Sequence, residues 1–309
     1  MEPRLASGVE GSSGEPVVSV IVPVFNQNER LSLCLGALEN QSYGKGRYEV
    51  IVIDNGSDLP VTDQVDGFPQ ARCEREGRPG AYVARNKGVQ VARGEVLAFT
   101  DADCLPAHDW IERGVVATRG LAGNGTVTGR IECTVEGSGR PTAAEVYESI
   151  LGFQQKTYLE HWGFSATANL FTTRATFEQV GSFDEKLRSG GDLDWGQRVR
   201  ELGLPQVYRE DVRVRHPARH SILELCRKNL RVAGGHHNLA QKRGLVAWSL
   251  LSQSRRDLFP LRPIANNIFD ERLTGVARKL EFVTVVWFVG VVRTMERFRI
   301  QLGGVPRRT

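Results

Sequence analysis

The chain has 309 residues, of which 40% are hydrophobic and 25% are charged, and its formal net charge is +4. These values are ordinary for a globular protein and exclude a fibrous or mainly disordered chain. The length allows one large α/β domain with additions, or two small domains.

The five cysteines are scattered and form no Cys-x-x-Cys pair: Cys34, Cys73, Cys104, Cys133 and Cys226. An odd number without paired spacing argues against a disulfide framework or a structural zinc site, and fits a reducing cytosol. Residues 1–14 lack an apolar signal segment and are rich in Gly, Ser and Glu, which predicts a disordered leader. We therefore expect a cytoplasmic protein.

Basic residues gather in the C-terminal third of the chain. Residues 213–309 contain 19 Lys and Arg and 6 Asp and Glu, whereas residues 1–212 contain 21 Lys and Arg and 30 Asp and Glu. This asymmetry indicates an anionic partner, such as a membrane surface, a nucleic acid or a phosphate-bearing substrate. The alternative is a basic face that is only solvated.

The first half of the chain alternates between apolar runs and helical patterns. Residues 17–24 and 48–53 are β-branched runs typical of strands buried on both faces. Leucines at helical spacing separate them until about Asn40, and this order predicts a right-handed βαβ unit. Residues 81–92 predict another helix, and residues 94–100 predict the next buried strand.

After Trp110 the pattern is less regular. We expect helices at residues 111–119, 143–159 and 192–202, and strands or extended segments at 125–133, 165–172 and 206–215, the last at a sheet edge. The tetrad Ser221-Ile222-Leu223-Glu224 has the form of a capping box and predicts the start of a further helix.

Two carboxylates, Asp101 and Asp103, follow the buried strand at 94–100. Ligands of open α/β sheets bind in the crevice at the carboxyl ends of the strands. Such a pair can hold a hard divalent cation that is shared with the phosphates of a nucleotide. The alternative is a polar turn that only ends the strand.

Five stretches stand in one order along the chain: residues 20–26 (VIVPVFN), 52–57 (VIDNGS), 84–88 (ARNKG), 99–103 (FTDAD) and 190–195 (GGDLDW) with Arg198. Together they closely resemble the family-2 inverting glycosyltransferases over roughly two thirds of the chain. The resemblance implies an α/β, GT-A-like (Rossmann-like) fold, with a mixed, mostly parallel sheet flanked by helices. We expect this domain at residues 15–218 and a basic, helical C-terminal extension at 219–309.

The resemblance also implies the binding site of a nucleoside diphosphate sugar. Asp54 would accept a hydrogen bond from the base, and Pro23 and Phe25 would line the base pocket. Arg78, Arg85 and Asn86 lie before or at the start of a helix, where cationic and amide donors suit a pyrophosphate. The alternative for Arg78, Arg85 and Lys87 is a solvated helix face.

The acidic pair takes two separate roles by the same resemblance. Asp101 would contact the ribose, and Asp103, the second Asp of this DXD motif, would bind Mn²⁺ or Mg²⁺. His216 lies where a histidine of related enzymes completes the metal or diphosphate site. A histidine satisfied in the core or at the surface is the alternative.

An inverting transferase needs a base that deprotonates the acceptor hydroxyl, and the resemblance assigns this role to Asp192. The family's usual Glu-Asp pair is followed by an Arg six residues after the Asp; here Arg198 keeps that spacing, but Gly191 replaces the Glu. This departure leaves Asp194 as a competing base. Trp195 would stack on a sugar or lie in the core, and Asn169 would lie near the donor sugar.

The apolar run at residues 282–292 is followed by Arg293, Arg297 and Arg299. Eleven residues are too few to span a bilayer, which needs about 20. The run predicts a buried helix, an oligomer contact, or an interfacial segment with its arginines on lipid headgroups. His236 and His237 lie in a glycine-rich stretch that predicts a loop near the acceptor site, with metal binding as the alternative.

The sequence thus predicts a metal-dependent, inverting glycosyltransferase that uses a nucleoside diphosphate sugar. We expect a glycan or lipid-linked acceptor of cell-envelope synthesis, bound by residues 132–161 and the C-terminal third, and no nucleic acid partner. The protein would lie in the cytoplasm or peripherally on the inner face of the membrane, with a homo-oligomer left open. The rival functions are a nucleotidyltransferase and a non-catalytic nucleotide-sugar-binding protein of the membrane surface.

Overall fold

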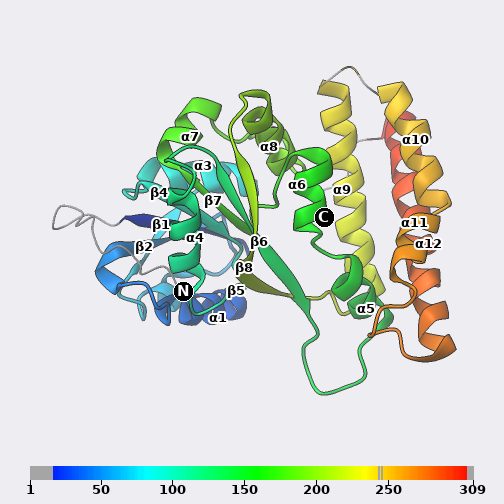
Figure 1. The fold of residues 1–309 in the computed structure, drawn as a ribbon, viewed down its shortest axis with the longest axis horizontal. Helices are drawn as coiled ribbons and strands as arrows, with labels where there is room; N and C mark the ends of the chain where they lie inside the picture. The colour runs from blue at the N-terminus through cyan, green and yellow to red at the C-terminus, as the bar shows by residue number, and fades with distance from the viewer. Residues whose placement is uncertain (1–16, 243, 245, 305–309) are drawn as a thin grey trace, which may run out of the picture.

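The computed structural model describes residues 17–242, 244 and 246–304. An eight-stranded sheet with the order β3-β2-β1-β4-β7-β6-β8-β5 forms the centre of the molecule (Figure 1). The strands are β1 (Val18–Val24), β2 (Tyr48–Asp54), β3 (Ala71–Arg75), β4 (Val96–Thr100), β5 (Leu105–Pro106), β6 (Thr126–Thr134), β7 (Asn169–Thr173) and β8 (Gln206–Pro217). The predicted leader at residues 1–14 lies outside the described residues.

Helices cover both faces of this sheet. They are α1 (Asn28–Glu39), α2 (Thr62–Val65), α3 (Ala81–Val91), α4 (Trp110–Arg119), α5 (Ala143–Leu151), α6 (Gln155–Trp162), α7 (Arg174–Val180) and α8 (Gly191–Glu201). Alternate strand residues face opposite sides: Val20 and Val22 pack with α1 and α4, whereas Ile21 packs with α3, α7 and α8. This burial on two faces explains why the parallel strands are continuously apolar.

The register of the parallel strands brings their polar ends together. β1 pairs in parallel with β2 and β4, so that Val24 lies opposite Asp54 and Ile21 lies opposite Phe99. β7 runs antiparallel to β4 and β6, which makes the sheet mixed. Asp54 and the acidic pair after β4 therefore reach the same edge of the sheet, as the sequence predicts.

Two predicted elements are wrong in detail. The helix expected at 143–159 is interrupted at Gly152, where a Cβ atom would come within 2.4 Å of the Glu148 carbonyl oxygen and 2.6 Å of Cys133 Sγ. β8 is not the edge strand, because the two-residue β5 pairs with its outer side. The strand β3 and the helix α7 were not predicted from the sequence.

The C-terminal extension is helical, as expected, and packs beside α5 and α6 (Figure 1). It comprises α9 (Ile222–Lys242), α10 (Val246–Leu258), α11 (Leu261–Asn267) and α12 (Gly275–Gln301). The capping box is confirmed, since the Glu224 amide donates to Ser221 Oγ and the Ser221 amide donates to Glu224. The loop predicted around His236 and His237 is wrong, because both residues lie within α9.

Among the described residues, no helix is both long enough and apolar enough to cross a membrane. The apolar run at 282–292 lies inside α12. Its Phe282, Val285, Val286 and Val289 pack against α5 and α9 in one hydrophobic cluster, so that one face of the run is a buried helix face.

Glu148 of α5 joins the sheet domain to the extension. Its side chain is 1% exposed and accepts hydrogen bonds from Lys228 of α9 at 2.6 Å and from the Arg219 guanidinium at 2.9 Å. Burial alone would raise the pKa of Glu148, but Lys228 and Arg219 together lower it to about 2. This carboxylate therefore stabilises the fold above its ordinary pKa of 4.5, and that stabilisation is lost as the pH falls toward 2.

Replacing Glu148 with Gln should lower the free energy of unfolding by about 3 kcal/mol, because it leaves Lys228 and Arg219 without their buried counter-charge. Urea titration near neutral pH measures this loss. The matched control is Glu160→Gln, which removes an exposed ion pair with Lys156 and should cost less than about 1 kcal/mol. Equal effects of the two changes would contradict the assignment.

Candidate active site

Asp54 ends β2 at the carboxyl edge of the sheet and is 4% exposed. Its Oδ1 atom accepts a hydrogen bond from the Ser57 amide at 2.8 Å, which fixes the carboxylate in the turn after the strand. Pro23 lies in the neighbouring strand opposite Ile53, and Phe25 is 58% exposed just beyond its end. The three residues predicted for the base pocket therefore lie together at one edge.

At the same edge, the buried Arg85 forms an ion pair with the half-buried Asp101. The Arg85 side chain, from α3, is 6% exposed, and its Nη2 atom donates to Asp101 Oδ1. Helix α3 packs very closely on the sheet, since a Cβ atom at Gly88 would meet Ile21 at 2.5 Å. This close packing lets the guanidinium reach the end of β4.

Asp103, which follows β4, and His216, near the end of β8, face one another. His216 Nε2 lies 3.4 Å from Asp103 Oδ2, and the imidazole is 4% exposed beneath the ring of Phe153. Its Nδ1 atom lies 2.8 Å from the Pro217 carbonyl, which only accepts, so Nδ1 carries the proton. With this proton on Nδ1, His216 presents Nε2 toward a carboxylate oxygen of Asp103.

One imidazole nitrogen and one carboxylate oxygen that converge on the same point fit a divalent cation. The described residues contain no group of three or more His, Cys, Asp or Glu side chains that would hold a metal alone. A sparse protein shell of this kind suits an ion whose remaining ligands are substrate phosphate oxygens and water.

Asp192 lies in the first turn of α8 and is half-buried. Its Oδ1 atom accepts hydrogen bonds from the Tyr82 hydroxyl at 3.1 Å and from the Leu193 amide at 3.0 Å. In the described residues no donor reaches Oδ2. Burial raises the pKa of Asp192, although the nearby Arg85 charge and these hydrogen bonds act in the opposite direction. A carboxylate with a raised pKa and one free oxygen is suited to accept a proton.

The competing carboxylate, Asp194, is already engaged. It is 4% exposed, and it pairs with Arg198 on its own helix at 3.2 Å and with Lys242 of α9 at 3.1 Å. Both oxygens of Asp194 are therefore occupied by cations, whereas no described residue donates to Oδ2 of Asp192. This difference favours Asp192 between the two candidates.

Asn169 lies inside the sheet rather than in a ligand pocket. It is fully buried, its Nδ2 atom donates to the Arg130 and Val212 carbonyls at 2.8 and 2.9 Å, and its Oδ1 atom accepts from Trp110 Nε1 at 2.9 Å. These three hydrogen bonds join β6, β8 and α4 to β7 through the Asn169 side chain. We therefore assign Asn169 to the sheet and not to the donor sugar.

Trp195 and Arg198 likewise lie in the interior of the fold. Trp195 is 1% exposed, donates to the Gly181 carbonyl at 2.8 Å, and packs against Phe177. Arg198 donates to the Val180 and Ser182 carbonyls at 2.6 and 2.7 Å, at the end of α7. The core alternative therefore holds for Trp195, and Arg198 stabilises the segment that precedes α8.

Asn86 and Arg78 are both held by the loop at residues 183–185. The Asn86 amide donates to the Phe183 carbonyl and accepts from the Phe183 amide, at 2.9 and 3.0 Å. Arg78 is exposed and pairs with Glu76 and Glu185. Asn86 therefore fixes this loop beneath α3, while Arg78 is a solvent-exposed cation near the same place.

The sequence prediction missed Tyr82, although a signal for it was available. Tyr82 precedes Arg85 by three residues on α3, so the two side chains share one helix face. The Arg85 guanidinium lies 5.6 Å from the centre of the Tyr82 ring. A residue at this spacing from a predicted active-site arginine is a candidate for the same site.

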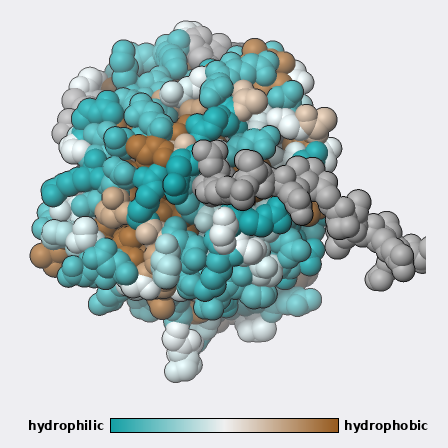
Figure 2. Space-filling view, turned by 90° about the vertical axis from the view of Figure 1, so that its left-hand side faces the viewer, coloured by the Kyte–Doolittle hydropathy of each residue, from teal (hydrophilic) through white to brown (hydrophobic). Residues whose placement is uncertain are grey.

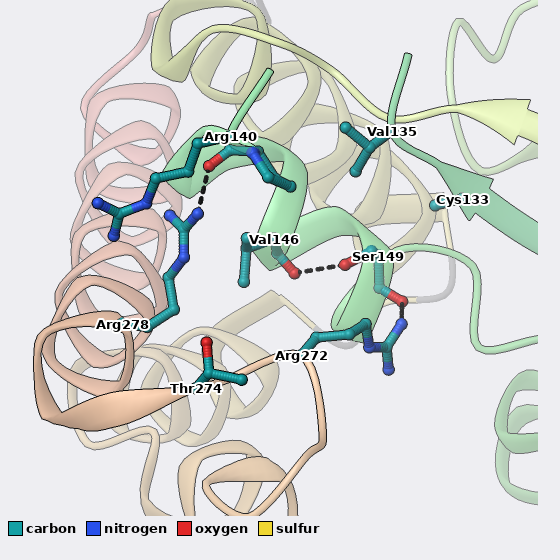
Figure 3. A pocket seen from close by; sticks show the side chains of 9 residues that line it. Cys133, Val135, Arg140, Val146, Ser149, Arg272, Thr274 and Arg278 are labelled. Carbon is teal, nitrogen blue, oxygen red and sulfur yellow. Dashed lines mark hydrogen bonds between the residues drawn. The ribbon is translucent and has the colours of Figure 1, made fainter. Parts of the chain in front are cut away.

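A pocket of about 720 Å³ lies beyond the end of β6, between α5 and the start of α12 (Figure 3). Arg272 and Arg278 line it, but each is anchored, since they donate to the Ser149 and Pro141 carbonyls respectively. Cys133, also in the lining, lies opposite His216 in the register of β6 and β8. The pocket therefore adjoins the His216 side of the site, within the region predicted for the acceptor.

Comparisons with known proteins identify the family and the fold of the chain. The family description "Glycosyl transferase family 2" matches residues 19–175. The chain is 38% identical over 251 residues to "Glycosyltransferase AglE" of Haloferax volcanii, covering 80% of this chain and 79% of that protein. It is 28% identical to "Pre-mycofactocin glycosyltransferase" of Mycobacterium tuberculosis, over 76% of this chain and 52% of that protein.

Solved structures with the same fold have lower identity. The mannosyltransferase PcManGT of Pyrobaculum calidifontis, in complex with GDP-Man and Mn²⁺, is similar with a TM-score of 0.55 and 17% identity, over 94% of this chain and 75% of that one. S. aureus TarS 1-349 in complex with UDP-GlcNAc is similar with a TM-score of 0.53 and 14% identity, over 94% and 93% of the two chains. These likenesses confirm the predicted GT-A-like fold.

Replacing Asn169 with Ala should lower the free energy of unfolding by about 3 kcal/mol, because it leaves two carbonyls and the Trp110 N–H without their buried partner. Chemical denaturation measures the loss. Affinity for Mn²⁺ and nucleotide, measured by calorimetry on the folded fraction, should not change. An Asn169→Ala variant that kept full stability but bound nucleotide more weakly would instead indicate that Asn169 contacts the donor.

Proposed function

Because the chain belongs to glycosyl transferase family 2 and is a glycosyltransferase, we propose that it catalyses metal-dependent, inverting transfer of a sugar. The donor is a nucleoside diphosphate sugar, and the acceptor is a hydroxyl group of a glycan or lipid-linked molecule of the cell envelope. One observation carries this proposal: the edge of the sheet that holds Asp54 and Asp101 also holds a pair suited to a cation, Asp103 and His216, and a free carboxylate oxygen on Asp192.

The donor binds along the carboxyl edge of β2, β1 and β4. Asp54, Pro23 and Phe25 receive the base, and Asp101, held by Arg85, receives the ribose. Two proteins of similar fold were solved with GDP-Man and with UDP-GlcNAc, which supports a nucleoside diphosphate sugar without deciding between bases. Arg78 is an exposed cation at the entrance of this edge.

Asp103 and His216 are the residues that would hold Mn²⁺ or Mg²⁺, through a carboxylate oxygen and an imidazole nitrogen. The ion, when bound, neutralises the charge that develops on the leaving nucleoside diphosphate. The Pro217 carbonyl keeps the proton of His216 on Nδ1, which leaves Nε2 free as a ligand. The mannosyltransferase of similar fold was solved with Mn²⁺.

Asp192 receives the proton of the acceptor hydroxyl on Oδ2, while Oδ1 stays bonded to Tyr82 and Leu193. The attacking oxygen approaches from the side opposite the leaving diphosphate, so the anomeric centre is inverted. Burial raises the pKa of this carboxyl and makes the ionised form a better base near neutral pH. The acceptor extends toward the pocket lined by Cys133, Arg272 and Arg278.

The extension, residues 219–309, docks on an anionic membrane surface through α12. Six apolar residues at helical spacing form its outer stripe: Val276, Leu280, Trp287, Met295, Phe298 and Leu302, each at least half exposed. Two arginines of α12 are instead paired on its inner side. Arg297 pairs with Asp257 at 2.6 Å, and Arg293 donates to Asn229 at 2.7 Å.

Because α12 also buries an apolar face, its exposed apolar stripe differs from the polar outer face of an ordinary amphipathic helix and indicates an apolar environment outside. Ten of the nineteen exposed large apolar side chains in the described residues lie between Phe259 and Leu302. In contrast, the face on the left of Figure 1 is mostly hydrophilic, with only small apolar areas (Figure 2). The excess of Lys and Arg over the extension as a whole favours an anionic surface as the partner.

Replacing Asp192 with Asn should lower kcat by roughly 10²–10⁴-fold, since it removes the base. The melting temperature should stay unchanged or rise, because an ionised group with a raised pKa costs stability at neutral pH. Release of nucleoside diphosphate from UDP- and GDP-sugars measures the rate. Thermal shifts caused by donor and Mn²⁺ should persist in this variant but weaken in Asp103→Asn.

Unchanged turnover in both variants would contradict the mechanism. Release of pyrophosphate without dependence on Asp192 would indicate the rival nucleotidyltransferase. Donor binding without any turnover by the unaltered chain, across a panel of acceptors, would indicate the non-catalytic rival.

Replacing Leu280 and Phe298 together with Asp should reduce co-sedimentation with phosphatidylserine-containing vesicles about tenfold or more, because each residue loses about 2 kcal/mol of apolar burial. The matched control replaces Leu33 of α1 and Val116 of α4, which are exposed to a similar degree, and should bind vesicles normally. A dimer that only the α12 variant dissociates, with no vesicle binding by either protein, would assign this surface to a second copy.

A further inference from the structure

Gly191, directly before the proposed base Asp192, has no side chain, and the ring of Tyr82 occupies the space that a side chain there would fill. We propose that Tyr82 is the positioning residue of Asp192 and that it replaces the acidic residue that usually precedes this base in the family. The inference rests on the proposed function, because it requires Asp192 to be the base. Its first observation is the 3.1 Å hydrogen bond from the Tyr82 hydroxyl to Asp192 Oδ1.

The second observation is steric. A Cβ atom built on Gly191 would lie 2.6 Å from Tyr82 Cε2 and 2.8 Å from both Cδ2 and Cζ. Those distances are far below van der Waals contact, so no side chain fits at position 191 while the ring stays in place. The Tyr82 ring therefore requires glycine at position 191. This requirement explains why the chain departs from the Glu-Asp pair of the family.

The ring of Tyr82 is buried beside an aromatic ring and a guanidinium group. It is 6% exposed and lies 5.7 Å from the ring of Phe183, whose backbone is held by the Asn86 amide. The Arg85 guanidinium lies 5.6 Å from its centre on α3. A ring with so few alternative positions keeps its hydroxyl directed at one carboxylate oxygen, which leaves Oδ2 of Asp192 in a defined orientation.

The charges around Asp192 determine what this hydrogen bond does. Arg85 of α3 faces it with a positive charge, while Asp194 on its own helix is neutralised by Arg198 and by Lys242 of α9. Burial raises the pKa of Tyr82, so its hydroxyl remains a donor throughout the working pH range. A donor of this kind stabilises the ionised form of Asp192 against the burial that opposes it.

Replacing Tyr82 with Phe keeps the ring and removes only the donor. We expect kcat to fall roughly tenfold, as for the loss of one hydrogen bond to a charged group, with the KM for the donor sugar unchanged. The acid limb of the kcat/KM profile should move to higher pH, because the carboxyl of Asp192 loses a bond to its ionised form. The matched control is Tyr48→Phe, which removes a buried hydroxyl bonded to the Leu38 carbonyl at the opposite end of β2 and should leave the profile in place.

A second pair of variants tests the shared space. Gly191→Glu alone should be inactive or unfolded, since its side chain collides with the ring. Combined with Tyr82→Ala, the same change should recover at least part of the activity that Tyr82→Ala alone loses. Failure of the double variant to exceed Tyr82→Ala, although it is folded by circular dichroism, would contradict the replacement of one group by the other.

The two proposals fail in different ways. If Asp192→Asn abolishes transfer but Tyr82→Phe changes neither kcat nor the acid limb, the positioning role of Tyr82 is wrong and the proposed function stands. If Asp192→Asn leaves transfer intact, the base itself is wrong and the role of Tyr82 fails with it. A lower kcat together with a shifted acid limb in Tyr82→Phe, and neither in Tyr48→Phe, supports the positioning role.

Discussion

The buried guanidinium of Arg85 is the interaction on which the site depends. A charge that is 6% exposed must be compensated within the protein, and Asp101 provides this compensation at the carboxyl end of β4. On its other side the same group faces the ring of Tyr82 and the carboxylate of Asp192. Arg85 thus lies between the acidic end of the sheet, where it bonds Asp101, and the first turn of α8, where its charge acts on Asp192.

Much of this arrangement could be predicted from the sequence, because periodicity and strand ends determine it. Apolar runs buried on both faces identify the parallel strands, and parallel strands carry their last residues to one edge. The carboxylates Asp54, Asp101 and Asp103 therefore meet there whatever the details of packing. The same reasoning explains why His216, at the end of a distant strand that runs in the same direction as β6, reaches this edge.

Side-chain direction was less predictable, because it depends on contacts between segments far apart in the sequence. Asn169, Trp195 and Arg198 lie in or beside motif positions, yet their polar atoms are bonded within the sheet or at the end of α7. Gly152, where α5 ends, is a related case, since a side chain there would collide with Cys133 Sγ and the Glu148 carbonyl oxygen. Spacing identifies which residues share an element, and packing decides which of them face the ligand.

The extension is part of the site's framework and not only an appendage. At one end of α9, Lys228 joins Glu148, and at the other end Lys242 joins Asp194, two residues after the proposed base. Between them Gly235 packs so closely on Ser189 that a Cβ atom would lie 2.5 Å from its carbonyl oxygen. Because α12 packs along α9, a surface that holds α12 also holds the helix that borders the base. If α12 docks on a membrane surface as proposed, α9 is the helix through which that docking reaches the proposed base.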